Sequence, residues 1–332
     1  MAITLADARL NTLDDIEMQV IDEFRKSSWL LDNLTFDDCV SPAGGGATLT
    51  YGYTRLVTER GAGFRKFNEE YPKEQAKRQR YTVDLGPLGG AFEVDRVLAT
   101  LGPAATNETT FQMTQTIKSA RAFFSDQVIN GERVTTPNEE EGFDGLDVAL
   151  AGSTTEMNAG SSLDWTGAAL GDDRGAANDA LDVLDEFLSL LDGTPAALLG
   201  NKKTIARVRS LARRAGYYDR TQDAFGQNVE SYNGIALVDL GAKAGSEAPV
   251  IPVEARELDG GSVTGVSDLY AVRLGLDGFH GVSTVGGQLV RQWLPDFSTA
   301  GAVKTGEVEM GPVAVALKAT KAAAVLRNIK VQ

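Results

Sequence analysis

Histidine and cysteine are nearly absent from this 332-residue sequence, which has one of each, His280 and Cys39. A single cysteine cannot form an intramolecular disulfide, so nothing in the sequence points to an oxidising compartment. A single histidine excludes, within one chain, a metal cage of several histidines or a relay between paired histidines. A Ser-His-Asp triad would have to use His280, and no Gly-x-Ser-x-Gly turn is present to carry its nucleophile.

Nucleotide-binding and membrane-spanning patterns are also missing. The glycines at 61 and 63 lack the third glycine of a dinucleotide loop, and Lys202 stands where a phosphate loop ending in Lys203-Thr204 requires glycine. The glutamates at 139–141 are adjacent in a polar segment, and such neighbours rarely converge on one cation. No run approaches the ~20 apolar residues of a membrane helix, and residues 1–13 lack the apolar stretch of a secretory signal. We therefore expect no cofactor, no metal site and no membrane segment.

What the sequence does contain is the composition of a soluble globular protein, with 42% hydrophobic and 23% charged residues. Its length allows one large or two ordinary domains, each with its own core. The formal net charge of -14 favours solubility and repels nucleic acid.

The most informative segment is a pair of strands joined by a long charged tip. Residues 48–57 and 80–85 both show the period-2 pattern of β-branched and aromatic residues that predicts a strand. Between them, residues 58–80 include 11 charged residues among 23, too few apolar groups for a core. An isolated hairpin is marginal in water, and a long connection in a compact domain is usually functional or disordered. We predict an arm that projects from its own subunit and is ordered by a neighbour; the alternative is a mobile surface loop.

The arm is basic although the chain as a whole is acidic. From residue 55 to residue 80 there are eight basic and four acidic residues, so the arm carries +4 and the rest of the chain -18. A basic arm on an acidic body suits self-association, because the arm of one copy can lie on the body of the next. The alternative is an ordinary solvated charged face. The predicted intersubunit contacts are the eight basic residues: Arg55, Arg60, Arg65, Lys66, Lys73, Lys77, Arg78 and Arg80.

Helices and strands are predicted along the rest of the chain. An amphipathic helix begins near residue 12, a glycine-rich joint spans 41–46, and the glycines of 86–90 indicate a turn. A long helix over 107–130 has the length of a spine for a flat subunit, and 151–174 has the composition of a loop. Further helices are predicted from 178 to 191 and from 201 to 216. The predicted strands span 196–199, 235–239, 269–274, 313–317 and 324–329.

The helix over 201–216 has six basic residues and no acidic one, which raises the possibility of nucleic-acid contact. The preceding helix has four acidic residues. Mutual neutralisation of the two helices, or a contact between subunits, is the simpler interpretation of this charge.

The order of these parts resembles the major capsid proteins of tailed bacteriophages, which have the HK97-like fold. The strings LLGNKKT at 198–204, LARRAGYY at 211–218, QNVESYNGI at 227–235, LVDLG at 237–241 and LYAVRLGLDG at 269–278 are similar to that family's central domain. The resemblance implies an α+β chain with an N-terminal arm at 1–46 and an extended loop at 47–92. It also implies a peripheral domain with the spine helix at 93–145, an axial domain at 146–299, and peripheral strands at 300–332.

The same resemblance implies a structural protein without catalysis. Its copies would form hexamers and pentamers of an icosahedral phage head around double-stranded DNA, assembled in the bacterial host cytoplasm. The implied partners are other copies, a separate scaffolding protein, a portal, a decoration protein, and DNA held without sequence specificity. One subfamily joins a loop lysine of one subunit to an asparagine of another. Lys66, Lys73, Lys77 and Asn328 occupy comparable regions here, but both residue types are too common to be specific.

Two other functions stay open at this stage. Encapsulin compartments share the fold and enclose enzymes in place of DNA. A hydrolase using His280 with Ser283 belongs to a different class altogether, although the string GVSTV at 281–285 lacks the second glycine of a nucleophile elbow.

Overall fold

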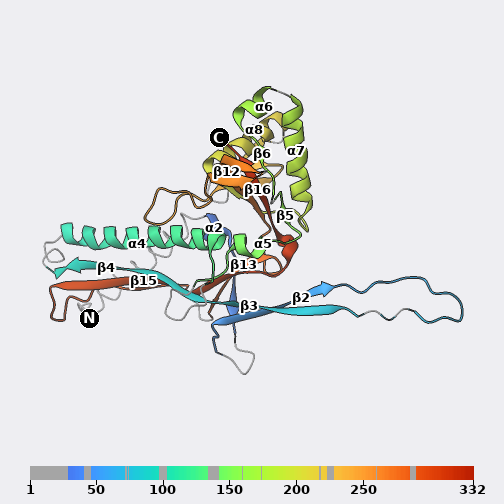
Figure 1. Ribbon diagram of the computed structural model, residues 1–332. Coiled ribbons are helices and arrows are strands. Elements are labelled where there is room, and N and C mark those ends of the chain that lie inside the picture. Colours follow the sequence, from blue (N-terminus) through green and yellow to red (C-terminus); the bar gives the residue numbers. More distant parts are fainter. Residues whose placement is uncertain are drawn as a thin grey trace.

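A computed structural model describes residues 29–40, 46–71, 73, 75–96, 103–133, 142–158, 160–172, 174–216, 218–222, 228–258, 260–284 and 289–332. The predicted N-terminal helix, the joint over 41–45 and the glutamates at 139–141 lie outside these ranges. Three parts are visible in Figure 1: a flat platform, a lobe above it, and a long arm that projects to the right. No helix in the described ranges is both long enough and apolar enough to cross a membrane.

The platform is a five-stranded sheet covered on one face by a long helix. The strands run in the order β1-β13-β15-β14, and β4 also pairs with β15. β1 is parallel to β13, whereas β13, β14 and β4 are antiparallel to β15. The bounds are β1 (Phe36–Cys39), β4 (Gly86–Asp95), β13 (Phe279–Thr284), β14 (Val290–Trp293) and β15 (Val303–Leu317).

The turn predicted from the glycines at 86–90 is wrong, because these residues form the first half of β4. Leu88, Phe92 and Val94 alternate inward along this strand and are buried. Gly89 allows the backbone of β15 to come close, since a Cβ atom there would lie 2.5 Å from the carbonyl oxygen of Val308. The glycine therefore marks a close strand pair and not a change of chain direction.

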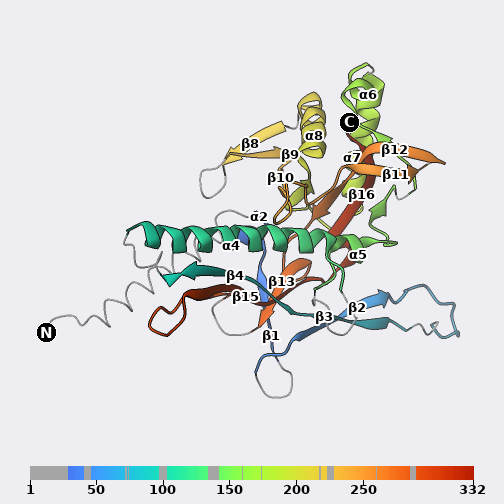
Figure 2. The same ribbon diagram turned by 60° about the vertical axis from the view of Figure 1, so that its left-hand side comes forward.

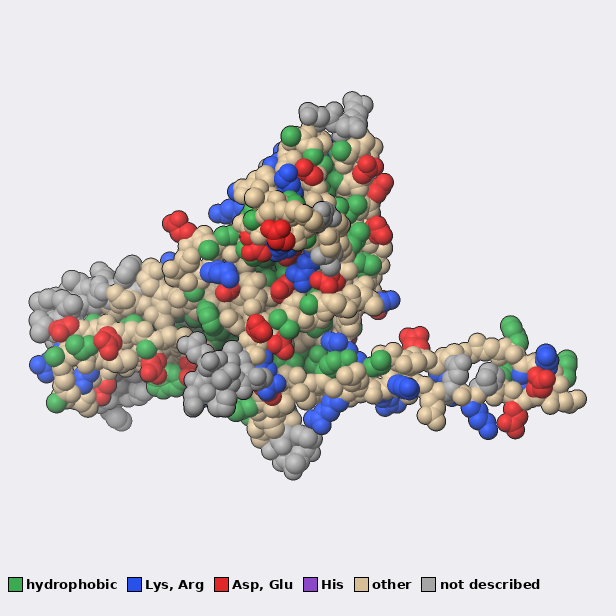
Figure 3. Space-filling view, viewed as in Figure 1, with side chains coloured by type: hydrophobic (Ala, Val, Ile, Leu, Met, Phe, Trp, Pro, Cys, Tyr) green, Lys and Arg blue, Asp and Glu red, His purple; other side chains and the backbone are tan. Residues whose placement is uncertain are grey.

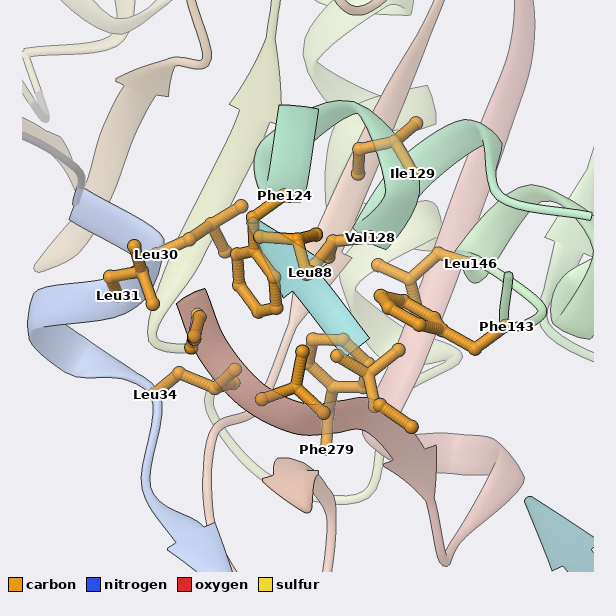
Figure 4. Close-up of a cluster of buried hydrophobic side chains, with 14 of the residues drawn as sticks. Leu30, Leu31, Leu34, Leu88, Phe124, Val128, Ile129, Phe143, Leu146 and Phe279 are labelled. Atoms are coloured by element: carbon orange, nitrogen blue, oxygen red, sulfur yellow. The ribbon is translucent and has the colours of Figure 1, made fainter. Parts of the chain in front are cut away.

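The long helix predicted over 107–130 is present as α4 (Pro103–Asn130), and it begins four residues earlier. Pro103 suits the first position of a helix, where its missing N–H would have no partner within the helix. Ile117, Phe124 and Val128 form the buried stripe that faces the sheet. Together with Leu30 of α2 (Trp29–Asn33) and Phe279 of β13 they make one continuous core (Figure 4).

A second sheet of nine strands links the platform to the lobe. Its main path is β5-β16-β12-β7-β10-β9-β8, with β11 paired to β12 and β6 paired to β16. Its bounds are β5 (Glu156–Met157), β6 (Leu163–Asp164), β7 (Ala197–Gly200), β8 (Tyr218–Gln222), β9 (Asn228–Tyr232), β10 (Ile235–Asp239), β11 (Glu254–Leu258), β12 (Gly261–Val272) and β16 (Ala323–Lys330). The strands predicted at 196–199, 235–239 and 324–329 are thus confirmed, and β12 and β15 extend well before the segments predicted for them.

Both faces of this sheet are buried, each against a different core. Leu199, Tyr270 and Val325 point into the core that the sheet shares with the platform. Leu198, Leu269 and Leu326, one residue along in each strand, point into the core beneath the lobe helices. The period-2 geometry of a strand therefore makes the same residues support both parts of the molecule.

The lobe contains α6 (Gly167–Asp172), α7 (Arg174–Ser189) and α8 (Lys202–Ala215), while the short α5 (Leu146–Leu150) packs beneath on α4. The loop predicted over 151–174 is wrong in part, because it includes β5, β6, α6 and the start of α7. Two-residue strands have no periodicity to detect, and both depend on pairing with β16. The short 3-10 helix η1 (Thr320–Ala322) connects β15 to β16.

The bounds of α8 follow from its end residues, as the sequence predicts. The side chain of Asn201 accepts hydrogen bonds from the backbone N–H groups of Lys203 and Thr204, so it caps the helix. Gly216 ends the helix in the left-handed conformation at φ 77°, which glycine adopts without strain.

Candidate interaction surface

The arm is a two-stranded antiparallel ribbon with a long tip. β2 (Thr50–Thr58) pairs with β3 (Lys77–Asp84), and the register places Tyr53 opposite Tyr81. β3 begins three residues before the predicted return strand. Beyond the strands, the tip extends away from the platform and the lobe without touching either (Figures 1 and 3). The described tip residues are all exposed, so the tip has no core of its own.

Aromatic side chains are uncovered at this tip. The exposed fractions are 108% for Phe64, 97% for Phe67 and 61% for Tyr71. Single exposed apolar residues are normal, but three aromatic rings at the end of one projection form a group that water solvates poorly. Figure 3 shows hydrophobic side chains, in green, at the far right end of the arm, interleaved with charged ones.

Seven of the eight basic residues predicted as contacts are exposed on the tip or on β3. Arg60, Arg65, Lys66 and Lys73 are in the tip, and Lys77, Arg78 and Arg80 are on β3; all are exposed. Arg65 donates to the carbonyl oxygen of Glu69 and lies 5.5 Å from the ring centroid of Tyr71. Lys73 and Glu70 form an exposed ion pair at 3.5 Å. Such a pair is worth little in water, so these cations remain available to another surface.

Arg55, the eighth residue, is placed differently, because it is bound within its own chain. Its Nε donates to the carbonyl oxygen of Lys318 at 2.9 Å, and its Nη2 donates to the carbonyl oxygen of Leu317. The guanidinium also lies 4.4 Å from the ring centroid of Tyr81. Arg55 therefore fixes the root of the arm to the end of β15, a role that spacing along the sequence does not reveal.

A second contact fixes the root of the arm to another platform strand, β1. The hydroxyl of Tyr51 donates to Oδ2 of Asp37 on β1 at 2.6 Å. Lys318 Nζ lies 3.4 Å from the same oxygen, and His280 Nε2 lies 4.0 Å from it. The ring of Tyr51 meets the imidazole edge to face at 5.9 Å. The only histidine of the chain thus lies beside the root of the arm.

The charges at this root shift one another's protonation. Burial alone would raise the pKa of Asp37, but the hydrogen bond from Tyr51 and the Lys318 cation hold it below its usual value. Burial and the Asp37 carboxylate raise the pKa of Tyr51. Burial and the nearby Lys318 cation lower the pKa of His280, so the buried imidazole is neutral at pH 7.

The geometry at His280 does not assemble a hydrolytic site. His280 and Ser283 are three positions apart on β13, so their side chains point to opposite faces of the strand. Both are buried, with exposed fractions of 0% and 6%. Among the described residues no group of three or more histidine, cysteine, aspartate or glutamate side chains is placed to hold a metal ion. The nucleophile and the base of the hydrolase alternative, Ser283 and His280, are therefore not in contact.

The asparagine considered for a covalent link is enclosed in a polar network. Asn328 is 3% exposed, and its backbone N–H donates to Asp268 at 3.0 Å. Its side-chain oxygen accepts from Arg256 at 3.0 Å, and its side-chain nitrogen donates to the carbonyl oxygen of Asn158 at 3.0 Å. Hydrogen bonding to Asp268 raises the pKa of Arg256 although burial alone would lower it. A lysine from another subunit could reach Asn328 only after this network opened.

No known family model matches the sequence, and no curated protein matches it either. Solved structures do match in three dimensions. One chain of the holo-SrpI encapsulin complex from Synechococcus elongatus is 16% identical with a TM-score of 0.56, covering 92% of this chain and 88% of that one. The capsid of an empty GTA particle is 17% identical with a TM-score of 0.53, covering 91% and 90%. A protein of Mycobacterium phage Bobi is 14% identical with a TM-score of 0.51, covering 91% and 90%.

These structures have the HK97-like capsid fold, and so does this chain. The fold class predicted from the sequence is therefore confirmed. The similar structures are shell proteins and not enzymes.

Proposed function

We propose that this chain is the major capsid protein of a tailed bacteriophage, whose copies form hexamers and pentamers of an icosahedral head. The observation that carries the proposal is the arm. It places three aromatic rings and an excess of positive charge in solvent, far from the platform and the lobe of its own chain. A hairpin of this kind is marginal alone and gains stability when it lies on another surface. Another copy of the chain offers an acidic surface of matching charge.

The parts of the chain receive roles in this proposal. Residues 1–46 are assigned to the N-terminal arm and 47–92 to the extended loop. The β2–β3 ribbon and its tip are the part that overlaps a neighbour, since β4 pairs from Gly86 onward with β15 of its own chain. Residues 93–145 with 300–332 form the peripheral domain, and 146–299 form the axial domain. The seven exposed basic residues of the arm are assigned to the contact with the neighbour. Arg55 is assigned to the root, because its hydrogen bonds go to Leu317 and Lys318 of its own chain.

The remaining features of the head follow from the same assignment. The acidic body allows packed double-stranded DNA to be enclosed without sticking to the wall, because like charges repel. A separate scaffolding protein, a portal and a decoration protein are the further partners, and assembly takes place in the cytoplasm of the bacterial host. We assign no catalysis to the chain, since its one histidine is buried and separated from Ser283 by the strand.

A second candidate is the shell of an encapsulin compartment. The encapsulin chain has the TM-score of 0.56, slightly above the values for the GTA and Mycobacterium phage Bobi chains. The contents of purified particles separate the two functions. Particles that contain double-stranded DNA support the phage head, and particles that contain an enzyme support the compartment.

The proposal is tested by removing the aromatic rings of the tip. Wild-type chain, alone or co-expressed with its scaffold, is expected to form megadalton particles in negative-stain electron microscopy and size-exclusion chromatography. The variant Phe64→Ser with Phe67→Ser is expected to stay as small soluble species, because the arm loses its apolar contact. Val148→Ser is the matched control, since Val148 is also an exposed apolar residue, at 43%, but lies on α5. Wild-type protein that remains a small monomer under all assembly conditions would contradict the proposal.

A further inference from the structure

The lobe carries a basic surface on one helix that its own chain leaves largely open. Lys202, Arg209 and Arg213 recur along α8 at the spacing of one helix face, and we call them the basic face. Lys202 and Arg213 are exposed, and Arg209 is half-buried beside Glu230 of β9, with which it forms an ion pair. Within the described ranges, no carboxylate lies in ion-pair distance of Lys202 or Arg213.

The neighbouring helix α7 carries the opposite charge along one of its faces. Asp179, Asp182 and Glu186 are exposed and lie three and four residues apart along α7, and we call them the acidic face. Asp185, next to this face, already accepts a hydrogen bond from the hydroxyl of Tyr232 at 2.9 Å. Acidic side chains line the right-hand edge of the lobe in Figure 3, where Figure 1 places α7.

The sequence allows two interpretations of these charges, neutralisation within the chain or a contact between subunits. The two faces do not neutralise each other within the chain. In the described part of the lobe, no ion pair joins α7 to α8. The helices lie over different parts of the nine-stranded sheet: α7 packs on β16, toward the β5 edge, and α8 packs on β7, β10, β9 and β8, toward the other edge. Figure 2 shows α8 on the side of the β8–β9 hairpin and α7 on the side of β16. The two helices touch each other, but they lie toward opposite edges of the sheet.

We propose that the basic face of α8 docks on the acidic face of α7 of the adjacent copy, so that lobes join head to tail in a ring. Two different complementary surfaces on opposite sides of one subunit form a heterologous contact, and such contacts close into rings when the rotation allows. The proposal rests on the proposed function, in which copies of the chain assemble. Opposite charges at such a contact set the orientation and the rate of association more than the affinity.

Nucleic acid is the other chemistry that would fit a basic helix. The second copy is favoured because a surface of opposite charge is present on the same lobe, and because the chain as a whole has a net charge of -14.

Charge reversal tests the contact. The acid-reversed variant is Asp182→Lys with Glu186→Lys, and the base-reversed variant is Lys202→Glu with Arg213→Glu. Each variant alone is expected to give at least about tenfold fewer particles than wild type, because like charges then face each other. A chain that carries all four substitutions is expected to restore assembly, since its two reversed faces are again opposite in sign at every contact. The matched controls, Glu93→Lys with Glu257→Lys and Arg291→Glu with Lys321→Glu, change exposed residues elsewhere and are expected to assemble as wild type.

Cysteine pairs give a second measurement that does not depend on reversed charge. A chain with Glu186→Cys and Arg213→Cys is expected to form a ladder of disulfide-linked multimers on a non-reducing gel, whereas Lys321→Cys with Arg213→Cys is not. The native Cys39 is buried and does not interfere.

The outcomes separate this inference from the proposed function. Wild-type particles with fully assembling reversed variants and no ladder overturn the contact and leave the shell intact. Base-reversed particles that assemble normally but contain less nucleic acid overturn it in favour of a nucleic-acid surface. A wild-type chain that stays monomeric without a ladder overturns both.

Discussion

Nε of Arg55 donates to the carbonyl oxygen of Lys318 at 2.9 Å, although the two residues are 263 positions apart in the chain. The Arg55 guanidinium also lies over the paired rings of Tyr53 and Tyr81 at the root of the arm. Arg55 therefore joins these rings to the end of β15, the longest platform strand. The rings stack at 5.8 Å. The angle at which the arm leaves the platform is therefore held by this side chain and two carbonyl groups, together with the hydrogen bond from Tyr51 to Asp37.

Replacing Arg55 by alanine is expected to loosen the root of the arm. Loss of hydrogen bonds from a charged, half-buried donor costs roughly 1–3 kcal/mol of unfolding free energy. Limited proteolysis is expected to cut the arm several times faster than in wild type, and thermal denaturation should begin earlier. Arg78→Ala is the control, since Arg78 is an exposed cation on the same hairpin. Equal cleavage rates in the two variants would show that Arg55 does not hold the arm.

Gly89→Ala is expected to disrupt the pair formed by β4 and β15. A Cβ atom at Gly89 would lie 2.5 Å from the carbonyl oxygen of Val308 and 2.9 Å from Cα of Glu309, and backbone atoms cannot move aside cheaply. We expect a destabilisation of about 2 kcal/mol or more, measured by chemical denaturation. Gly63→Ala is the matched control, because a Cβ atom there meets nothing within 4 Å. A normal midpoint for Gly89→Ala would contradict the close approach of these strands.

Asn201 is expected to contribute to stability in two separable ways. Its side-chain oxygen caps α8, and its side-chain nitrogen donates to the hydroxyl of Ser267 at 2.6 Å inside the core. Asn201→Ala removes both and is expected to cost about 2 kcal/mol. Asn201→Asp keeps the capping oxygen and loses the donor, so its denaturation midpoint should fall between those of Asn201→Ala and wild type. The reverse order of the two variants would mean that the cap is unimportant.

Stability is expected to fall as the pH drops below about 6.5, the ordinary pKa of histidine. The folded pKa of His280 is lower than this value, so the unfolded chain binds the proton first and is favoured by acid. The loss ends once the pH passes the folded pKa. The groups that face the imidazole are Asp37, Lys318 and Tyr51.

The measurement is the melting temperature as a function of pH. His280→Gln is expected to show a smaller fall than wild type across this window, whatever its stability at neutral pH. Asp37 affects stability at lower pH than His280 does. Its folded pKa is lowered from 3.8, so its contribution to stability is lost only as the pH falls below that value. Parallel curves for wild type and His280→Gln would remove the histidine as the cause.

The elements that the sequence predicts well are those whose signals are local. Asn201 and Gly216 mark the ends of α8 because capping depends on a few neighbouring residues. The arm is recognisable because alternating strands flank a charged segment, and its projection follows from the lack of apolar residues in that segment. The buried strands β7 and β10 are short apolar runs between turn residues, which local composition also reveals.

The elements that it misses depend on distant partners. The glycines of β4 look like a turn until β15 is seen to lie against Gly89. β5 and β6 exist because β16 offers them hydrogen bonds, and two residues carry no periodicity. Arg55 looks like any other arm cation because its acceptors belong to residues 317 and 318. The charges of α7 and α8 look mutually neutralising because a sequence does not tell which side of a sheet-bound helix faces its neighbour.

The direct continuation of β3 through Leu85 into β4 has a mechanical consequence. A pull on the tip of the arm is passed along the covalent backbone into β4, which is paired with β15 from Gly86 to Asp95. Tension along that direction strains the cross-strand bonds together instead of one after another. Such a pull would thus be spread over the whole ladder before any single bond had to break.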